Sequence, residues 1–431
     1  MSSCQAMQPH LRTILIFRPP IWGMVRHRPA QEMPVNLTWK ENRMKALTLT
    51  CAVMFGCMPL AAHGADDLTL GFLTAHSGPF ASLSRTNGIA VDMAVEQINA
   101  SGGVNGHNLR VITFDTAGDA RQAALGVRQL AQDNQALAVI GPFSSSEVRT
   151  AFPTGERLGI AEMAIASSAP GLAKSYSFAF RNTTDEGIVV DQVMAALRTA
   201  HLPMATGAVA YATDDVVSKT MGTTVLPQVF HKYGVEMKGS IDFQLAAFDL
   251  SSQVSQLKEM HPDLLALGTP PEVAINLARE MKRQGVDARI VGGTTVADPE
   301  LPARLQGNGE NLTIGTTFYA QHDERTRSFA QEFSSRAHAV GMTRTVPNQM
   351  DAVAYDIVYL YAQAMKQGRL TGDKAHLAEE RTAMRDALAK ISDFPALEGN
   401  ITINAEHDAI KPVYVLEIYD GAWKLLPAGT P

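Results

Sequence analysis

The chain has 431 residues, of which 45% are hydrophobic and 19% are charged. This composition is typical of a folded globular protein and excludes a disordered chain, and the length suits two domains rather than one. The formal net charge of −6 is unevenly spread, because residues 1–43 carry +4 and residues 66–431 carry −11. An acidic body of this kind argues against a nucleic-acid partner.

The N-terminal part has the pattern of a secretory signal peptide. A short basic start at Met44-Lys45 precedes a mostly apolar run over residues 46–60 and a small-residue segment over 61–65. The apolar run is too short for a membrane span, and Pro59 argues against a buried N-terminal helix. We therefore predict a signal peptide over residues 44–65, a periplasmic location, and an initiator at Met44. Residues 1–43, which show no sustained periodicity, are then expected to be a non-native upstream extension.

The cysteines are confined to this N-terminal part. Cys4, Cys51 and Cys57 all lie in the first 57 residues. The remaining chain can form no disulfide and no thiolate metal site.

The first elements of the body form a strand–helix–strand unit. Residues 68–73 read as a buried strand, residues 87–100 as an amphipathic helix and residues 109–114 as a second strand. Apolar residues recur in the helix at three- and four-residue spacing, and Gly102 and Gly103 supply left-handed positions that end it. A unit of this length is a right-handed crossover in a parallel sheet.

Strands and helices then alternate through two similar blocks. Helices are expected at 120–133, 147–157, 185–200, 216–233, 251–260 and 272–285, and strands at 138–141, 160–166, 206–212, 235–243, 264–268 and 289–292. Helices near 324–340, 349–366 and 376–391 follow, and paired strands near 400–403 and 413–419 close the chain. The predicted fold class is therefore α/β, with two Rossmann-like lobes built on parallel sheets.

Serine-rich loops follow two of these strands. In the sequence VIGPFSSSE, over residues 139–147, the strand ends at Gly141 and the serines lead into a helix that offers Ser145 and Ser146. Free backbone N–H groups at a helix start bind anions, and open α/β folds bind ligands at this edge of the sheet. A plain serine N-cap is the alternative reading. The second loop, after the strand at 160–166, offers Ala166, Ser167 and Ser168.

The loop after the first strand is a third candidate. It reads AHSGPFAS over residues 75–82. Phe80 could cover a ligand or stack on it, and His76 could donate a hydrogen bond, although ordinary loop packing explains both.

The sequences of these segments resemble those of the type I periplasmic binding proteins of ABC transporters, in the branch that binds leucine, isoleucine and valine. The resemblance covers residues 68–425, including the helix start at 349–356 and the tail at 412–423. It implies three crossings between the lobes, near Thr183, Thr316 and Asn400. Lobe one would comprise 66–182 and 317–399, and lobe two 183–316 and 400–431.

The resemblance also implies how a ligand would be held. Ser145, Ala166 and Ser168 would bind its carboxylate through backbone and hydroxyl groups. In lobe two, Thr294 stands at the position that is acidic in the amino-acid binders, and Thr269 stands at the position that is often a tyrosine. Because a buried ammonium without a carboxylate partner is costly, we expect a small carboxylate ligand, preferably an amine-free or aromatic acid.

Asp215 and Glu272 could each replace the missing acid of lobe two. Both are instead expected to cap their helices.

The resulting prediction is a monomeric substrate-binding protein that needs no cofactor and no metal and docks on an inner-membrane permease. A periplasmic ligand sensor of the same fold is the alternative. An enzyme is not expected, because the chain has no Gly-x-Ser-x-Gly elbow, no His-Glu-x-x-His motif and no Walker lysine.

Overall fold

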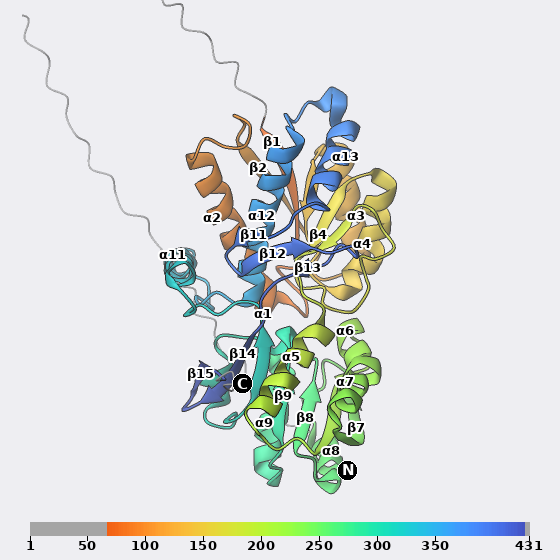
Figure 1. The fold of residues 1–431 in the computed structure, drawn as a ribbon, viewed down its shortest axis with the longest axis vertical. Coiled ribbons are helices and arrows are strands. Elements are labelled where there is room, and N and C mark those ends of the chain that lie inside the picture. Colours follow the sequence, from red (N-terminus) through yellow and green to blue (C-terminus); the bar gives the residue numbers. More distant parts are fainter. Residues whose placement is uncertain (1–66, 427–431) are drawn as a thin grey trace, which may run out of the picture. The chain divides into compact units, whose positions relative to one another are not determined.

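The computed structural model describes residues 67–426, so the expected signal peptide and the upstream extension lie outside the described residues. The first sheet is formed by β1 (Leu68–Thr74), β2 (Leu109–Asp115), β3 (Ala138–Ile140), β4 (Ala161–Ala164) and β5 (Ala179–Arg181). Its helices are α1 (Ala81–Ser84), α2 (Asn87–Ala100), α3 (Ala120–Arg128) with a π-turn η1 (Gln129–Asp133), α4 (Ser145–Leu158), α11 (Glu324–Ala339), α12 (Gln349–Gly368), η4 (Lys374–His376) and α13 (Leu377–Leu388). We call this sheet and its helices lobe one (Figure 1).

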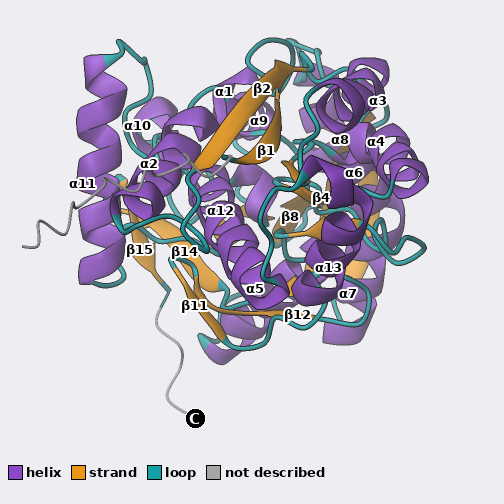
Figure 2. Ribbon diagram, turned by 90° about the horizontal axis from the view of Figure 1, so that it is seen from above, coloured by secondary structure: helices purple, strands orange, loops and turns teal. Residues whose placement is uncertain are grey.

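Lobe one is a parallel sheet buried on both faces. The strand order is β2-β1-β3-β4-β5, and every adjacent pair is parallel. Side chains alternate along β1, so Leu70 and Phe72 pack with α2, α12 and α13 while Leu73 packs with α3 and α4. Figure 2 shows these purple helices flanking the orange strands. The order reverses between β1 and β3, which makes these two strands the switch point of the sheet.

Lobe two is built around a second, larger sheet. Its strands are β6 (Thr206–Ala212), β7 (Glu236–Phe243), β8 (Leu264–Leu267), β9 (Arg289–Gly292), β10 (Thr313–Thr316), β14 (Tyr414–Tyr419) and β15 (Ala422–Leu425). Its helices are α5 (Glu186–Thr199), α6 (Val216–Thr220), η2 (Met221–Val225), α7 (Leu226–Tyr233), α8 (Ser251–Met260), α9 (Pro271–Gln284), η3 (Thr294–Val296) and α10 (Leu301–Leu305). The order is β15-β14-β10-β9-β8-β6-β7, so the switch point lies between β6 and β8.

The sequence predicted most of these elements, and three of the differences bear on the architecture. The sheet of lobe two is not wholly parallel, because β14 pairs antiparallel with β10 and with β15. The strands expected to pair near 400–403 and 413–419 belong to different sheets, so that expectation is wrong. β12 (Gly399–Ile403) instead pairs with β11 (Phe394–Ala396) and β13 (Ala409–Ile410). Third, residues 216–233 form α6, a π-turn and α7 rather than one regular helix.

The glycine pair after α2 behaves as predicted. Gly102 and Gly103 have φ values of 96° and 72°, and the helix ends before them. In residues 67–426 no helix has both the length and the apolar character needed to cross a bilayer. The lobe bounds near 182, 316 and 399 stay predictions.

Candidate functional site

The loops at the switch point of lobe one carry the serines singled out in the sequence. Ser144 is the N-cap of α4 and forms a capping box, in which Glu147 accepts hydrogen bonds from its amide at 2.8 Å and from its hydroxyl at 2.7 Å. The plain N-cap reading therefore holds for Ser144. Ser145 and Ser146 follow in the first helical turn, whose amides have no partner within a helix.

The loop after β4 is packed against this helix start. The Ala169 amide donates to Ser145 Oγ at 3.3 Å. The Ala166 amide already donates to Phe143 O, and the Ser168 amide donates to Ala166 O. The backbone groups expected to bind a carboxylate at Ala166 and Ser168 are thus engaged within the protein. The side chains of Ser167 and Ser168 are the groups that this loop leaves available.

Buried hydroxyl groups without a hydrogen-bond partner mark the site. Within residues 67–426 they are those of Thr74, Ser167, Ser168, Thr184 and Thr269. Each of these residues lies at the carboxyl end of a parallel strand or in the loop that follows it: β1, β4, β5 and β8. A buried polar group without a partner costs roughly 1–3 kcal/mol. Their position at the carboxyl edges of the two sheets therefore indicates a place built to hydrogen-bond a ligand.

Lobe two also presents polar groups at the carboxyl ends of its parallel strands. Thr269 follows β8 and is fully buried, and Thr294 follows β9 and is 1% exposed. Thr294 Oγ1 donates to Glu186 Oε2 at 2.6 Å, and Thr295 donates to Glu186 Oε1 from its amide at 3.4 Å and its hydroxyl at 3.3 Å. The position expected to lack an acid therefore touches one that comes from the start of α5.

Glu186 is a further candidate site residue, which the sequence alone did not single out. It is fully buried, its amide donates to Ser168 O at 3.0 Å, and the Ser168 hydroxyl lies near its carboxyl without a well-oriented hydrogen bond. Burial raises the pKa of the Glu186 carboxyl above its usual value, while the hydrogen bonds from Thr294 and Thr295 pull it down. Nothing in its sequence context separates it from an ordinary acid in the first turn of a helix.

The two acids considered as replacements serve other purposes. Asp215 caps α6 as predicted and accepts from the Ser218 amide at 2.8 Å. Glu272 does not cap α9, whose N-cap is Pro270. It pairs instead with Arg304 at 3.3 Å. These contacts therefore do not support Asp215 or Glu272 as the substitute acid of lobe two.

A cavity of about 410 Å³ opens between residues of lobe one and residues of lobe two. On one side it is lined by Ala81, Ser82 and Arg85, which follow the loop after β1. On the other side it is lined by Glu272 and Arg304 among others, and Glu272 lies just beyond Thr269. The cavity is therefore lined by the helices that follow β1 and β8, α1 and α9, whereas the unpartnered hydroxyls and Glu186 are not among its lining residues.

The aromatic and histidine candidates of the first loop lie near this cavity but are tied to the protein. Phe80 directly precedes α1 and packs against Phe143 in a tilted arrangement, with ring centroids 5.9 Å apart. The His76 amide donates to Asp115 Oδ1 at 3.0 Å, while its ring Nε2 is buried without a partner. Phe80 thus has a packing role that does not depend on a ligand.

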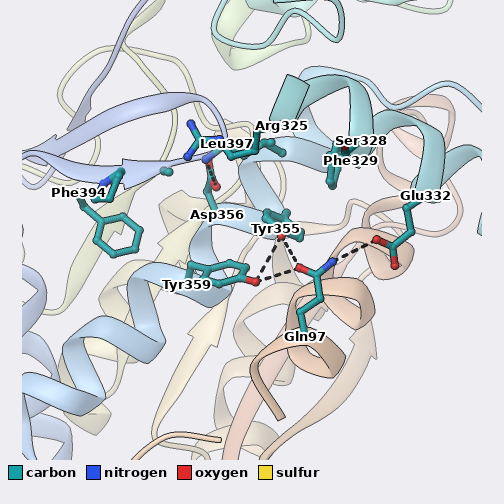
Figure 3. Close-up of a pocket in the computed structure, with 12 residues that line it drawn as sticks. Gln97, Arg325, Ser328, Phe329, Glu332, Tyr355, Asp356, Tyr359, Phe394 and Leu397 are labelled. Atoms are coloured by element: carbon teal, nitrogen blue, oxygen red, sulfur yellow. Dashed lines mark hydrogen bonds between the residues drawn. The ribbon is translucent and has the colours of Figure 1, made fainter. Parts of the chain in front are cut away.

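A second pocket, of about 470 Å³, lies within lobe one (Figure 3). Its polar groups satisfy one another, because Tyr355 and Tyr359 donate to Gln97 Oε1 at 2.5 and 2.9 Å and Gln97 Nε2 donates to Glu332 at 3.2 Å. Unlike the edge between the lobes, this pocket contains no buried hydroxyl that lacks a partner.

Two α/β lobes with polar switch-point loops define a class of ligand-binding protein, and comparisons agree with that class. A family model described as periplasmic binding protein matches residues 67–422. The leucine-, isoleucine-, valine-, threonine- and alanine-binding protein of Pseudomonas aeruginosa is 24% identical over 312 residues, which cover 68% of this chain and 79% of the relative.

Solved structures show the same fold. A branched-chain amino acid transporter substrate-binding protein from Streptococcus pneumoniae, in complex with isoleucine, is 20% identical and matches with a TM-score of 0.72 over 83% of this chain and 98% of that one. A solute-binding protein from R. palustris, in complex with benzoate, is 16% identical and matches with the same TM-score over 85% and 97%. The chain belongs to the type I periplasmic binding proteins of the branched-chain amino acid family.

Proposed function

We propose that this protein is the substrate-binding component of an ABC transporter, which captures a small carboxylate between its two lobes and delivers it to an inner-membrane permease without changing it chemically. The observation that carries the proposal is the set of unpartnered buried hydroxyls at the switch-point edges. A ligand that accepts and donates hydrogen bonds there recovers the desolvation cost of those groups. Secretion to the periplasm and action as a monomer belong to the same proposal.

The carboxylate of the ligand is best placed at lobe one. The hydroxyls of Ser167 and Ser168 are unpartnered, and the first turn of α4 directs its free amides toward the same edge. These donors suit an anion. We assign no charged side chain of lobe one to direct contact with the carboxylate.

Glu186 supports a ligand that also carries an amino group. Its carboxyl hydrogen-bonds Thr294, the position that was expected to lack an acid, and it lies beside Ser168. A cation next to this buried carboxyl would offset the burial that raises its pKa. We therefore favour an α-amino acid over the amine-free acid that the sequence suggested. The similarity in fold to a benzoate-binding protein keeps the amine-free acid as the second candidate.

The test compares leucine with 4-methylpentanoate, which is leucine without its amino group. Calorimetric titration of the wild type is expected to show tighter binding of leucine. Glu186→Gln keeps the size and the acceptor but removes the charge. Removing one partner of a buried charge pair costs roughly 2–5 kcal/mol, so leucine should bind at least about 30-fold more weakly to the variant.

The matched control is Glu272→Gln, which changes an acid at the cavity that is already paired with Arg304. It should leave leucine affinity near the wild-type value. Tighter binding of 4-methylpentanoate than of leucine by the wild type would reject the amino-acid ligand and favour the amine-free acid.

A further inference from the structure

The guanidinium of Arg181, at the end of β5, is completely buried and fully engaged. Its Nε and Nη2 donate to Asp408 Oδ1 and Oδ2 at 2.6 and 2.5 Å, and Nη1 donates to the carbonyls of Ser167 and Ala169 at 2.8 and 2.5 Å. The guanidinium also lies 3.9 Å from Asp185. A planar fork with donors on several edges can hold an acid and two carbonyls at once, which a lysine cannot.

These two carbonyls flank Ser168 in the loop after β4. With the carbonyls turned toward Arg181, the loop keeps the hydroxyls of Ser167 and Ser168 buried and unpartnered. An unpartnered buried hydroxyl is unfavourable, so the loop would relax if it were free to do so. The arginine supplies the interactions that hold the loop in this conformation when no ligand is present.

Asp408 anchors the arginine from a distant part of the chain. It lies in the turn before β13, and its amide donates to Asn404 Oδ1 at 2.9 Å. The same turn is fixed to β5, because the Arg181 amide donates to His407 O at 3.0 Å and the His407 ring stacks on Phe180 with centroids 4.4 Å apart. The acid therefore has a rigid support of its own.

We propose that Arg181 and Asp408 form a positioning pair, which does not touch the ligand but preorganises the Ser167–Ser168 loop to receive its carboxylate. The proposal rests on the proposed function. Holding a binding loop in its bound conformation removes the cost of ordering it on binding. Removing the pair should therefore weaken ligand binding by more than the accompanying change in stability explains.

The test uses the double variant Arg181→Met/Asp408→Leu. Removing the arginine alone would leave a buried aspartate unpaired and could unfold the protein, whereas apolar replacement of both partners is often neutral for stability. The control is Arg381→Met. Arg381 is also a buried arginine of lobe one, and it holds the carbonyls of Ala131 and Ala136 at 2.7 Å, away from this loop.

Two quantities are measured in each protein: hydrogen exchange of the Ser168 and Ala169 amides without ligand, and affinity for leucine and for benzoate. We expect the double variant to exchange these amides at least about tenfold faster and to bind the ligand at least about tenfold more weakly. The control variant should change neither quantity, although its melting temperature falls.

Unchanged exchange at the two amides in the double variant would overturn the proposal. So would wild-type affinity in a double variant whose loop exchanges faster. If the wild type binds neither probe while the loop still loosens in the double variant, the proposed ligand class fails but the positioning of the loop by the pair stands.

Discussion

Single buried residues in this protein differ mainly in whether their polar atoms have partners. Glu147 and Glu162 are both buried glutamates of lobe one. Glu147 accepts hydrogen bonds from Ser144 and from Thr116. Glu162, in β4, has no partner for either carboxyl oxygen, and burial raises its pKa well above the usual 4.5. Glu162 is therefore protonated in the folded protein over a range of pH in which the unfolded chain is ionised.

This difference gives a prediction for Glu162→Met. Because the folded pKa is raised, wild-type stability falls as the pH rises above 4.5, the value at which the unfolded chain ionises, toward the folded pKa. The apolar variant lacks this loss and the roughly 1–3 kcal/mol cost of an unpartnered group, so it should melt higher. The gain should be larger at pH 7.5 than at pH 4.5, as measured by thermal unfolding. Glu147→Met, which breaks the capping box, should instead lower the melting temperature at both values.

Some residues of the candidate site could be predicted from the sequence and one could not. Ser145, Ser167 and Ser168 could be selected because two serine-rich loops follow parallel strands, where open α/β folds bind ligands, and the structure packs these loops against each other. Glu186 could not, because an acid in the first turn of a helix is ordinary. Its role depends on the approach of Thr294, which is 108 positions away in the chain.

At the scale of elements, a buried ion pair joins the three segments where crossings between the lobes are expected. Lys411 Nζ donates to Glu398 Oε2 at 2.5 Å and to Asn182 O at 2.6 Å. Thr317 Oγ1 donates to the other oxygen of Glu398. The side chains of Lys411 and Glu398 have no exposed surface. One pair thus links the segments after β5, after β10 and around β12.

Removing one member of this pair should be costly. Lys411→Met leaves a buried carboxylate without a counter-charge and should lower the free energy of unfolding by about 3–5 kcal/mol. Adding Glu398→Leu should recover most of that loss, which urea denaturation would show. The surface pair Lys174–Glu406, at 2.7 Å, is the control, and Lys174→Met should leave the midpoint unchanged. An equally small effect of Lys411→Met would show that the pair does not join these segments energetically.

The sequence predicted long elements better than short ones. Helices such as α2, α9 and α12 have apolar residues at helical spacing over many turns, and their predicted bounds lie within two residues of the observed ones. β5 and β10 have three and four residues and were missed. Equally short strands such as β3, β8 and β9 were predicted, because each follows a recognisable helix in the alternating pattern, whereas pairing with neighbouring strands determines β5 and β10.

At the scale of the whole described chain, the two sheets share one design, because each carries unpartnered threonine hydroxyls at its switch point. Thr74 ends β1 in lobe one and Thr269 follows β8 in lobe two. Resemblance in sequence was enough to predict two lobes of this fold. It was not enough to predict the ligand, because the site we propose depends on a few side chains in loops and on Glu186, an acid from a different element than expected.

The most direct test of the central claim, that these hydroxyls await a ligand, is a comparison of wild type and Thr269→Val by thermal unfolding, with and without leucine, 4-methylpentanoate or benzoate. Valine has nearly the shape of threonine but lacks the hydroxyl. Without ligand the variant should melt higher, because it has lost an unpartnered buried group. With the carboxylate that stabilises the wild type, the variant should gain less, because at one ligand concentration a weaker-binding ligand stabilises the folded state less. An equal gain in both proteins, or no gain in the wild type with any of the three acids, would contradict the account.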